Sequence, residues 1–242
     1  MEGKEYKISA LTERCKALGI HLDQRQTEQF MIYYEYLTEQ NQFLNLTGIT
    51  EFEEVMVKHF VDSLSIVNGI DMNHCKTLID VGTGAGFPGL PLKIAFPHLH
   101  VVLLDSLNKR INFLNTLIEK LQCTDIETIH GRAEDIARKK EYREMFDLSV
   151  SRAVANLASL SEYCIPFVKV NGFFVSYKST DIEEETEKAG HAISVLGGTV
   201  KDKKKFMLPE SDIGRSLVII QKTKHTSGKY PRKAGLPSRM PL

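Results

Sequence analysis

Apolar residues recur at helical spacing through the first 70 residues of the chain. Within each of two sets, successive residues are three or four positions apart. The first set is Ile8, Leu11, Cys15 and Leu18, and the second is Phe30, Tyr34 and Leu37. This spacing places each set on one face of an α-helix. Asp23 precedes the second set and is a suitable N-cap. A third helical stretch is predicted from about Glu51 to Val67, and no strand is predicted before residue 70.

After residue 70 the pattern changes to short aliphatic runs that alternate with amphipathic helices. Five runs predict strands: Thr77–Val81, His100–Leu104, Ile126–His130, Asp147–Ser151 and Gly172–Tyr177. This alternation indicates βαβ units and a mostly parallel sheet with helices on both faces. A helix near Asp181–Leu196 precedes two further strands, Thr199–Met207 and Ser216–Lys222. Because no helix separates these two, we expect an antiparallel pair, which completes a seven-stranded, Rossmann-like α/β sheet.

These patterns divide the chain into three parts. Residues 1–70 form an N-terminal helical extension, residues 71–222 the α/β core, and residues 223–242 a basic tail. The tail holds three prolines and two glycines: Pro231, Pro237, Pro241, Gly228 and Gly235. Proline lacks a backbone N–H and has a fixed φ, so we expect the tail to lie extended without regular structure.

The composition is that of a globular protein, with 42% hydrophobic and 26% charged residues. This argues against disorder of the whole chain. The formal net charge is zero, but from Lys201 onward eleven lysines and arginines face three acids, a net charge of +8. A basic end on a neutral protein suggests a local anionic partner. A solvated tail that only aids solubility is the alternative.

The four cysteines, Cys15, Cys75, Cys123 and Cys164, form no CxxC pair, so neither a zinc site nor a disulfide framework is indicated. His98 and His100 lack a third ligand at suitable spacing, and we expect no metal. Neither a signal peptide nor an apolar run of membrane-spanning length is evident. We therefore expect a cytoplasmic protein without a membrane partner.

A glycine-rich stretch, Asp80–Gly89, follows the first predicted strand and opens a helix. Its glycines include Gly82, Gly84 and Gly86, which permit a tight turn and let backbone N–H groups approach a ligand. Asp105 ends the next strand, where a carboxylate can accept hydrogen bonds from ribose hydroxyls. A glycine turn needed only for packing is the alternative to a nucleotide site.

Two nucleotide ligands fit this pattern. Gly84, Gly86 and Gly89 match GxGxxG with an acid about twenty residues on, as in NAD-dependent oxidoreductases. The carboxylate of Asp80, just before the first glycine, instead favours the sulfonium-bearing amino acid of S-adenosylmethionine and disfavours a pyrophosphate. The predicted antiparallel strand pair also suits a methyltransferase sheet better. We favour S-adenosylmethionine and keep NAD as the alternative.

Residues after the third and fourth strands bear on the cofactor and the methyl acceptor. Ala133 and Glu134 follow strand three, beside the expected adenine pocket; an ordinary first-turn helix acid is the alternative for Glu134. Arg152 follows strand four and could hold the acceptor or the cofactor carboxylate, unless it forms a surface salt bridge. Methyltransferases that act on exocyclic amines commonly carry an Asn/Asp-Pro-Pro-aromatic motif after strand four, and this chain has none. The nucleophilic cysteine of pyrimidine carbon-5 methyltransferases usually follows a proline, whereas Cys164 precedes Ile165 and Pro166. A lone-pair acceptor such as guanine N7 remains, and no catalytic acid or base is assigned.

Seven stretches resemble one family in sequence and in order. They are Asn45–Thr47, Lys58–Leu64, Asp80–Gly89, Leu104–Ser106 with Lys109–Arg110, Gly131–Glu134, Ser151–Val154, and Tyr230–Arg232 closing on Pro241–Leu242. Together they resemble the bacterial ribosomal RNA small subunit methyltransferase G family, also called glucose-inhibited division protein B. The match runs from about residue 40 to the end, and residues 1–40 carry no matching motif.

The resemblance implies a class I methyltransferase fold and S-adenosylmethionine-dependent N7 methylation of one guanine in a 16S rRNA loop. The substrate would be the small ribosomal subunit or its assembly intermediate, and we expect a monomer. It also implies five cofactor contacts: Gly82, Phe87, Ala133, Glu134 and Arg152. N7 lies in a groove of A-form RNA that is too deep and narrow for side chains, so the guanine must be unpaired or splayed out. A non-catalytic assembly factor on the same fold is a further alternative.

Two groups of residues are candidates for RNA contact. Lys58, His59 and Asp62 lie together on a predicted helix, either at the rim of the acceptor site or as a helix-surface pair. The tail contributes Arg232, Lys233 and Arg239 as candidate phosphate contacts, with a disordered cationic end as the alternative. On the phosphate interpretation, replacing Arg232 weakens RNA binding in a salt-dependent way.

Overall fold

Helices fill the chain from residue 2 to about residue 70, as the apolar spacing predicts. The computed structural model describes residues 2–242, with side chains from Ile8 onward. Helices α1 (Glu2–Ala17) and α2 (Gln24–Leu44) precede a continuous helical stretch, made of α3 (Phe52–Val55), the π-helical turn η1 (Met56–Val61), α4 (Asp62–Leu64) and the 3-10 turn η2 (Ser65–Asn68). Asp23 caps α2 in a capping box with Gln26, which satisfies two backbone N–H groups at the helix start.

Seven strands form one sheet in the order β3-β2-β1-β4-β5-β7-β6. They are β1 (Thr77–Val81), β2 (His100–Asp105), β3 (Ile126–His130), β4 (Phe146–Arg152), β5 (Val168–Lys178), β6 (Gly198–Met207) and β7 (Gly214–Lys222). The pairs among β1 to β5 are parallel, and β7 pairs antiparallel with both β5 and β6. The predicted α/β fold class, with its antiparallel C-terminal pair, is confirmed.

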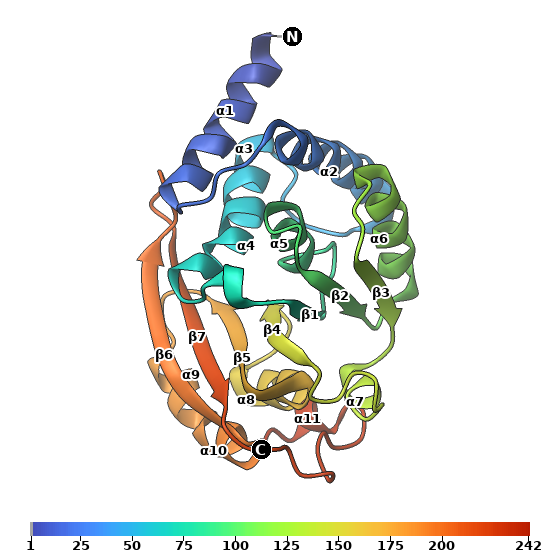
Figure 1. The fold of residues 1–242 in the computed structure, drawn as a ribbon, viewed down its shortest axis with the longest axis vertical. Helices are drawn as coiled ribbons and strands as arrows, with labels where there is room; N and C mark the ends of the chain where they lie inside the picture. Colours follow the sequence, from blue (N-terminus) through green and yellow to red (C-terminus); the bar gives the residue numbers. More distant parts are fainter. Residues whose placement is uncertain (1) are drawn as a thin grey trace.

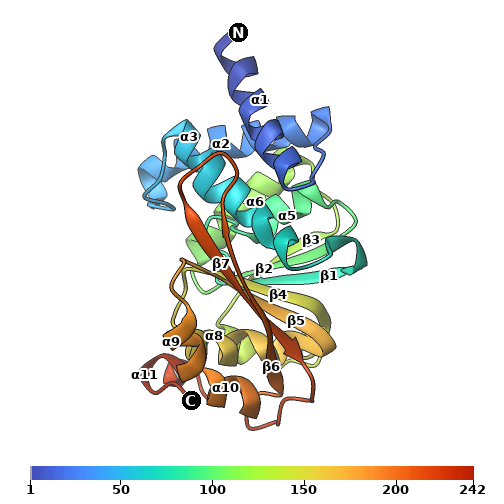
Figure 2. The ribbon, with the colours of Figure 1, turned by 90° about the vertical axis from the view of Figure 1, so that its left-hand side faces the viewer.

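Helices cover both faces of the sheet (Figures 1 and 2). On one face lie α2, α3 and α4 with α5 (Gly89–Ala95) and α6 (Asn108–Leu121). On the other lie α8 (Leu157–Cys164), α9 (Glu183–Lys188), α10 (Gly190–Val195) and α11 (Leu236–Arg239). The short α7 (Ala133–Ile136) follows β3, and two 3-10 turns, η3 (Met72–His74) and η4 (Ile165–Phe167), precede β1 and β5.

Two predicted elements differ from the structure. The helix expected near Asp181–Leu196 is two short helices, α9 and α10, which meet at Ala189. The tail was expected to be extended without regular structure, and this was wrong. It contains α11 and folds back beneath the sheet against α8, where Pro231 and Pro237 are buried. Proline at the start of a helix is compatible with helical φ, so Pro237 does not prevent α11 from forming.

The N-terminal helices share one hydrophobic core with the sheet. Phe30, Tyr33 and Phe60 are fully buried in the same cluster as Leu78 of β1 and Leu114 of α6. Tyr33 also donates a buried hydrogen bond of 2.6 Å from its hydroxyl to the backbone oxygen of Ala85, in the glycine loop. The helical extension therefore supports the loop directly.

Replacing Tyr33 by Phe should lower the free energy of unfolding by about 1–2 kcal/mol, because the buried Ala85 oxygen loses its donor. Urea denaturation monitored by circular dichroism measures this change. Tyr34→Phe is the matched control on the same helix, since its hydroxyl makes only a long, exposed contact of 3.4 Å to Thr50. Equal destabilisation by the two substitutions would contradict the assigned role of Tyr33.

Candidate cofactor and acceptor site

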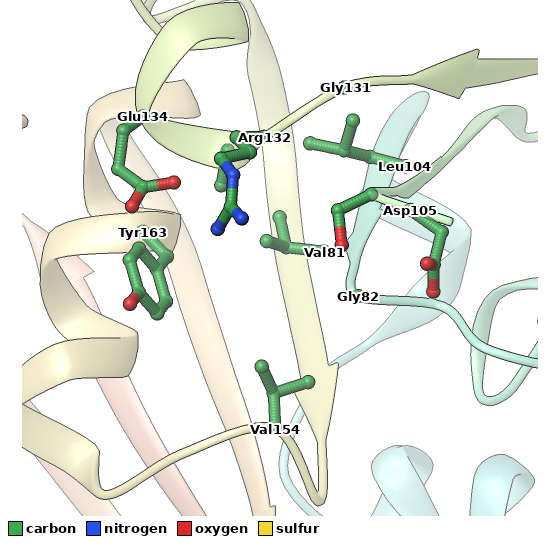
Figure 3. A pocket seen from close by; sticks show the side chains of 11 residues that line it. Val81, Gly82, Leu104, Asp105, Gly131, Arg132, Glu134, Val154 and Tyr163 are labelled. Atoms are coloured by element: carbon green, nitrogen blue, oxygen red, sulfur yellow. The ribbon is translucent and has the colours of Figure 1, made fainter. Parts of the chain in front are cut away.

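A crevice opens at the carboxyl ends of β1 and β4, where the strand order reverses. Ligands of open α/β sheets bind at this position. One part of the crevice, shown in Figure 3, is a cavity of about 160 Å³. It is lined by Val81, Gly82, Leu104, Asp105, Ser106, Gly131, Arg132, Ala133, Glu134, Val154 and Tyr163. Loops after four strands thus meet here, including three predicted to hold the cofactor.

The carboxylate of Asp80 organises the glycine loop from beneath. Its Oδ2 atom accepts hydrogen bonds from the Thr83 hydroxyl and the Gly89 backbone N–H, both at 2.7 Å. Asp80 is fully buried, and burial raises its pKa to about 7, although both hydrogen bonds oppose that rise. Its Oδ1 atom has no hydrogen-bond partner among the described residues. Asp80 therefore lies behind the loop and does not line the cavity.

The loop leaves space for a ligand at Gly84. A Cβ atom on Gly84 would meet no atom within 4 Å, so this glycine faces the open crevice. A Cβ on Gly82, in contrast, would lie 2.6 Å from Cγ2 of Val154. Both glycines have positive φ, which favours glycine at these positions. The loop is thus a cradle whose backbone can approach a bound molecule closely.

Asp105 lies at the end of β2 with both carboxylate oxygens engaged. Oδ2 accepts from the Gly84 N–H at 2.9 Å and from Arg110 at 3.2 Å, and Oδ1 accepts from the Leu107 N–H at 2.9 Å. A carboxylate offers about four acceptor positions, so capacity for a ribose hydroxyl remains. Asp105 also fixes the glycine loop to the end of the neighbouring strand.

The opposite wall of this cavity comes from α7 and α8. Glu134 is only 4% exposed and points toward Tyr163, as Figure 3 shows. Its Oε1 atom accepts a hydrogen bond of 2.8 Å from the N–H of Gly235, in the tail. Ala133 lines the cavity beside it. Tyr163 belongs to this wall and was not predicted from the sequence, because it lies within a helix and carries no motif.

A second cavity, of about 410 Å³, continues the crevice on the other side of Gly82 and Val154. Three aromatic rings and one guanidinium group are stacked in and behind its wall. His59 lies over Phe87 with ring centroids 4.4 Å apart, and Phe87 stacks on Tyr33 at 5.2 Å. The guanidinium of Arg152 lies 5.2 Å from the centre of the Phe87 ring. The structure therefore brings together His59, Phe87 and Arg152, which are far apart in the sequence.

Arg152 is the centre of a charged network. Its Nη1 atom donates to Oδ2 of Asp62 at 2.9 Å, and Nε of Arg215 donates to the other carboxylate oxygen at 3.0 Å. Asp62 is 3% exposed, so this is not the surface salt bridge considered for Arg152. A buried charge needs such partners, because desolvation without them is costly. Arg215 had no motif to mark it in the sequence.

His59 is held in its neutral form. Burial and the charge of Arg152 lower the pKa of its imidazole to about 3. Arg152 can only donate, at 3.4 Å to Nδ1, so Nε2 carries the hydrogen and donates it to the Thr47 hydroxyl at 2.8 Å. That hydroxyl also accepts from the Ile49 N–H at 3.0 Å. With both lone pairs engaged, Thr47 presents a donor to the cavity that it lines.

A third cavity, of about 400 Å³, adjoins the second and shares His59, Arg152 and Ala153 with it. Four cationic side chains line it: Lys58, Arg152, Lys178 and Arg215. Asp62 is the one acid among its lining residues. Lys58, His59 and Asp62 thus share this rim, as their spacing predicts, although Lys58 also pairs with Glu54.

The three tail cations differ in their surroundings. Arg232 forms an ion pair with Glu162, a residue of α8 that is 0% exposed. Its guanidinium is therefore engaged by a buried acid, which excludes the alternative of a disordered cationic end at this residue, and its contact with phosphate stays a prediction. Lys233 and Arg239 are exposed on the surface. Contact of these two with RNA stays a prediction.

A sequence model of the family described as rRNA small subunit methyltransferase G, or GidB, matches residues 26–213. The chain belongs to this family. The match covers the glycine loop and the segments carrying His59, Glu134 and Arg152, and it ends before the tail.

Full-length relatives of the rRNA small subunit methyltransferase G family agree with this assignment. The protein of that name from Lachnoclostridium phytofermentans is 53% identical over 234 residues, 97% of each chain. The protein from Acetivibrio thermocellus is 50% identical over 244 residues and covers 100% of both chains. A solved structure of StiE O-MT, residues 961–1257, is 13% identical with a TM-score of 0.56, covering 79% of this chain and 83% of that one. This last likeness concerns the fold alone.

No helix within residues 2–242 combines the length and apolar character needed to cross a membrane. Across the same residues, no three His, Cys, Asp or Glu side chains are grouped as metal ligands would be.

The low pKa of His59 predicts a loss of stability in acid. Between pH 6.5 and about 3 the unfolded imidazole binds a proton and the folded one does not, so stability falls as pH falls. From pH 7 to pH 5, the native chain should lose about 1–2 kcal/mol more unfolding free energy than the His59→Asn variant. Urea denaturation at both pH values tests this, and parallel pH profiles of the two proteins would refute it.

Proposed function

We propose that this protein transfers a methyl group from S-adenosylmethionine to N7 of one guanine in 16S rRNA. One observation carries the proposal: in a member of the rRNA small subunit methyltransferase G family, the cradle at Gly84 opens onto a cavity that is continuous with a cation-lined cavity. A nucleoside-sized donor and a polyanionic acceptor can therefore meet where the two cavities adjoin, beside His59 and Arg152.

Eight residues are assigned to the cofactor: Gly82, Gly84, Gly86, Phe87, Asp105, Ala133, Glu134 and Arg152. Their chemistry fits the group, since a Cβ at Gly84 would meet no atom within 4 Å and the open cradle there admits a ligand. Asp105 supplies acceptors for ribose hydroxyls, and Glu134 supplies an acceptor for the adenine amino group. S-adenosylmethionine, when bound, supplies an electrophilic methyl group on a sulfonium.

The residues around the acceptor act by positioning. Guanine N7 carries a free lone pair, so no side chain has to remove a proton from it. Holding the reactants in line can lower the barrier by about 7–11 kcal/mol. Arg152 and His59 form a rigid wall on Phe87, and the cations Lys58, Lys178 and Arg215 suit the flanking phosphates.

Thr47 gives this wall a means of selecting guanine. The Hoogsteen edge of guanine presents two acceptors, N7 and O6, whereas adenine has an amino donor in place of O6. Because both lone pairs of Thr47 are engaged, its hydroxyl donates and complements O6 of guanine. An adenine would bring a second donor to the same point.

The acceptor guanine is unpaired or splayed out, because N7 of a paired guanine lies in the major groove of A-form RNA, which is too deep and narrow for side chains. We place the reaction in the cytoplasm, on the small ribosomal subunit or its assembly intermediate, with the protein acting as a monomer. Lys233 and Arg239, exposed in the tail, are proposed to add phosphate contacts.

Small subunits from cells that lack this protein are the substrate for the decisive experiment. Incubation with the purified protein and S-adenosylmethionine should yield one N7-methylguanine in 16S rRNA, mapped by mass spectrometry. Gly84→Ala should reduce the yield at limiting cofactor at least tenfold, because its Cβ fills ligand space and its φ is strained.

Gly190→Ala is the matched control, since a Cβ at this position in α10 also meets no atom within 4 Å but lies in a helix remote from the crevice. Methylation of another base, or of no base, would refute the proposed function. Tight binding of NAD without binding of S-adenosylmethionine would favour an oxidoreductase.

Replacing Thr47 by Val should lower the methyl-transfer rate about 3–10-fold, the equivalent of one hydrogen bond in the transition state. Thr47→Ser should restore the rate, because a serine hydroxyl accepts and donates in the same way. Thr50→Val on the same loop is the control, since Thr50 is exposed and does not line the cavity. Single-turnover kinetics at saturating cofactor measure these rates. An unchanged rate for Thr47→Val would show that the hydroxyl donates no hydrogen bond to the guanine in the transition state.

A further inference from the structure

The C-terminal tail is bound to the body of the protein by arginines that donate to its backbone oxygens, of which Arg143 is half-buried and Arg138 is exposed. Arg143 donates to the backbone oxygens of Thr226 and Tyr230, at 2.8 and 3.0 Å. Arg138 donates to the backbone oxygen of Pro231. Cationic donors that satisfy backbone oxygens in this way fix the path of a segment without regular structure.

Arg232 is the strongest attachment of the tail. Its Nε lies 3.0 Å from both oxygens of Glu162, and its Nη2 lies 2.7 Å from Oε2. The backbone N–H of Arg232 also donates to Oε1 of Glu162, at 2.6 Å. Removing one partner of such a pair leaves an uncompensated charge in the interior. This arrangement leaves little of the Arg232 guanidinium for a phosphate.

Beyond Arg232 the tail reaches the wall of the first cavity. The Gly235 N–H donates to Oε1 of Glu134 at 2.8 Å, and the Ser238 hydroxyl donates to the backbone oxygen of Gly235 at 3.1 Å. Ser159 of α8 donates to the backbone oxygen of Pro237 at 2.8 Å. Glu134, whose side chain forms part of this wall in Figure 3, is thus held from behind by the tail.

We propose that the tail segment Tyr230–Ser238 is a positioning element of the cofactor pocket, which fixes Glu134 to receive the amino group of adenine. The inference rests on the proposed function and extends it. Gly235 occupies one carboxylate oxygen, so the other is held in a single direction toward the cavity. A side chain that is already ordered loses less entropy when the ligand binds, and this preorganisation raises affinity.

This assignment and the phosphate-contact interpretation of Arg232 predict opposite results for Glu162→Gln. Glu162 is fully buried and cannot touch RNA, so its loss would leave a phosphate-binding Arg232 intact or freer. A positioning tail requires the Arg232–Glu162 pair, so Arg232→Ala and Glu162→Gln must have the same effect on the cofactor.

Calorimetric titration with S-adenosylhomocysteine and S-inosylhomocysteine separates these possibilities, because the inosine compound has an oxygen in place of the adenine amino group. The native protein should prefer the adenosine compound. Arg232→Ala and Glu162→Gln should bind it at least tenfold more weakly, with less than a twofold change for the inosine compound. Lys233→Ala and Arg239→Ala, which alter only exposed cations, should bind both compounds like the native protein.

Truncation after Lys233 provides a second variant in case the buried substitutions prevent folding. It keeps the Arg232–Glu162 pair but removes Gly235, the donor to Glu134, and it should show the same selective loss. Equal losses for the two compounds, or an unchanged affinity with weaker, salt-dependent RNA binding by Arg232→Ala, would overturn the inference. A native protein that binds neither compound would instead refute the proposed function.

Discussion

The buried carboxylate of Asp80 is the contact on which the site depends. It binds the start of the glycine loop at Thr83 and the start of α5 at Gly89, so the whole turn is closed around one side chain. A Cβ on Gly89 would lie 2.9 Å from that carboxylate, which is why the helix can begin so close to the strand. The loop can then present Gly84 to the crevice, because its own backbone is supported from below.

The acceptor side depends on a different principle, the mutual neutralisation of buried charges. Asp62 is bonded to Arg152 and Arg215, so one carboxylate joins α4 to the ends of β4 and β7. Burial, together with the charge of the same Arg152, lowers the pKa of His59 and keeps it neutral, and the Arg152 donor defines which ring nitrogen carries the hydrogen. The donor character of Thr47 follows from that choice. On the proposed function, hydrogen bonds through His59 thus connect the buried Asp62–Arg152 pair to the preference of the Thr47 hydroxyl for O6 of guanine.

Much of the fold could be read from the sequence, because helix and strand periodicities are local. All seven strands lie within a few residues of their predicted ranges, since each is an aliphatic run bounded by polar or turn residues. The break at Ala189 and the short helix α11 were missed. Both are one- or two-turn features that are stabilised by packing, which a pattern of apolar residues does not encode.

For the site, the sequence by itself identified the residues whose chemistry is tied to a local motif: the glycine loop, Asp105 and Arg152 at the ends of β2 and β4, and Glu134 after β3. Only the tertiary structure decided which distant groups meet them. Tyr33, Arg215 and Tyr163 carry no motif, and Arg232 reads as a free cation until Glu162 is found beside it. The physical reason is that burial and ion pairing are set by groups far apart in the sequence: the Tyr33 hydroxyl and the Ala85 backbone oxygen are 52 residues apart, and Asp62 and Arg215 are 153 residues apart.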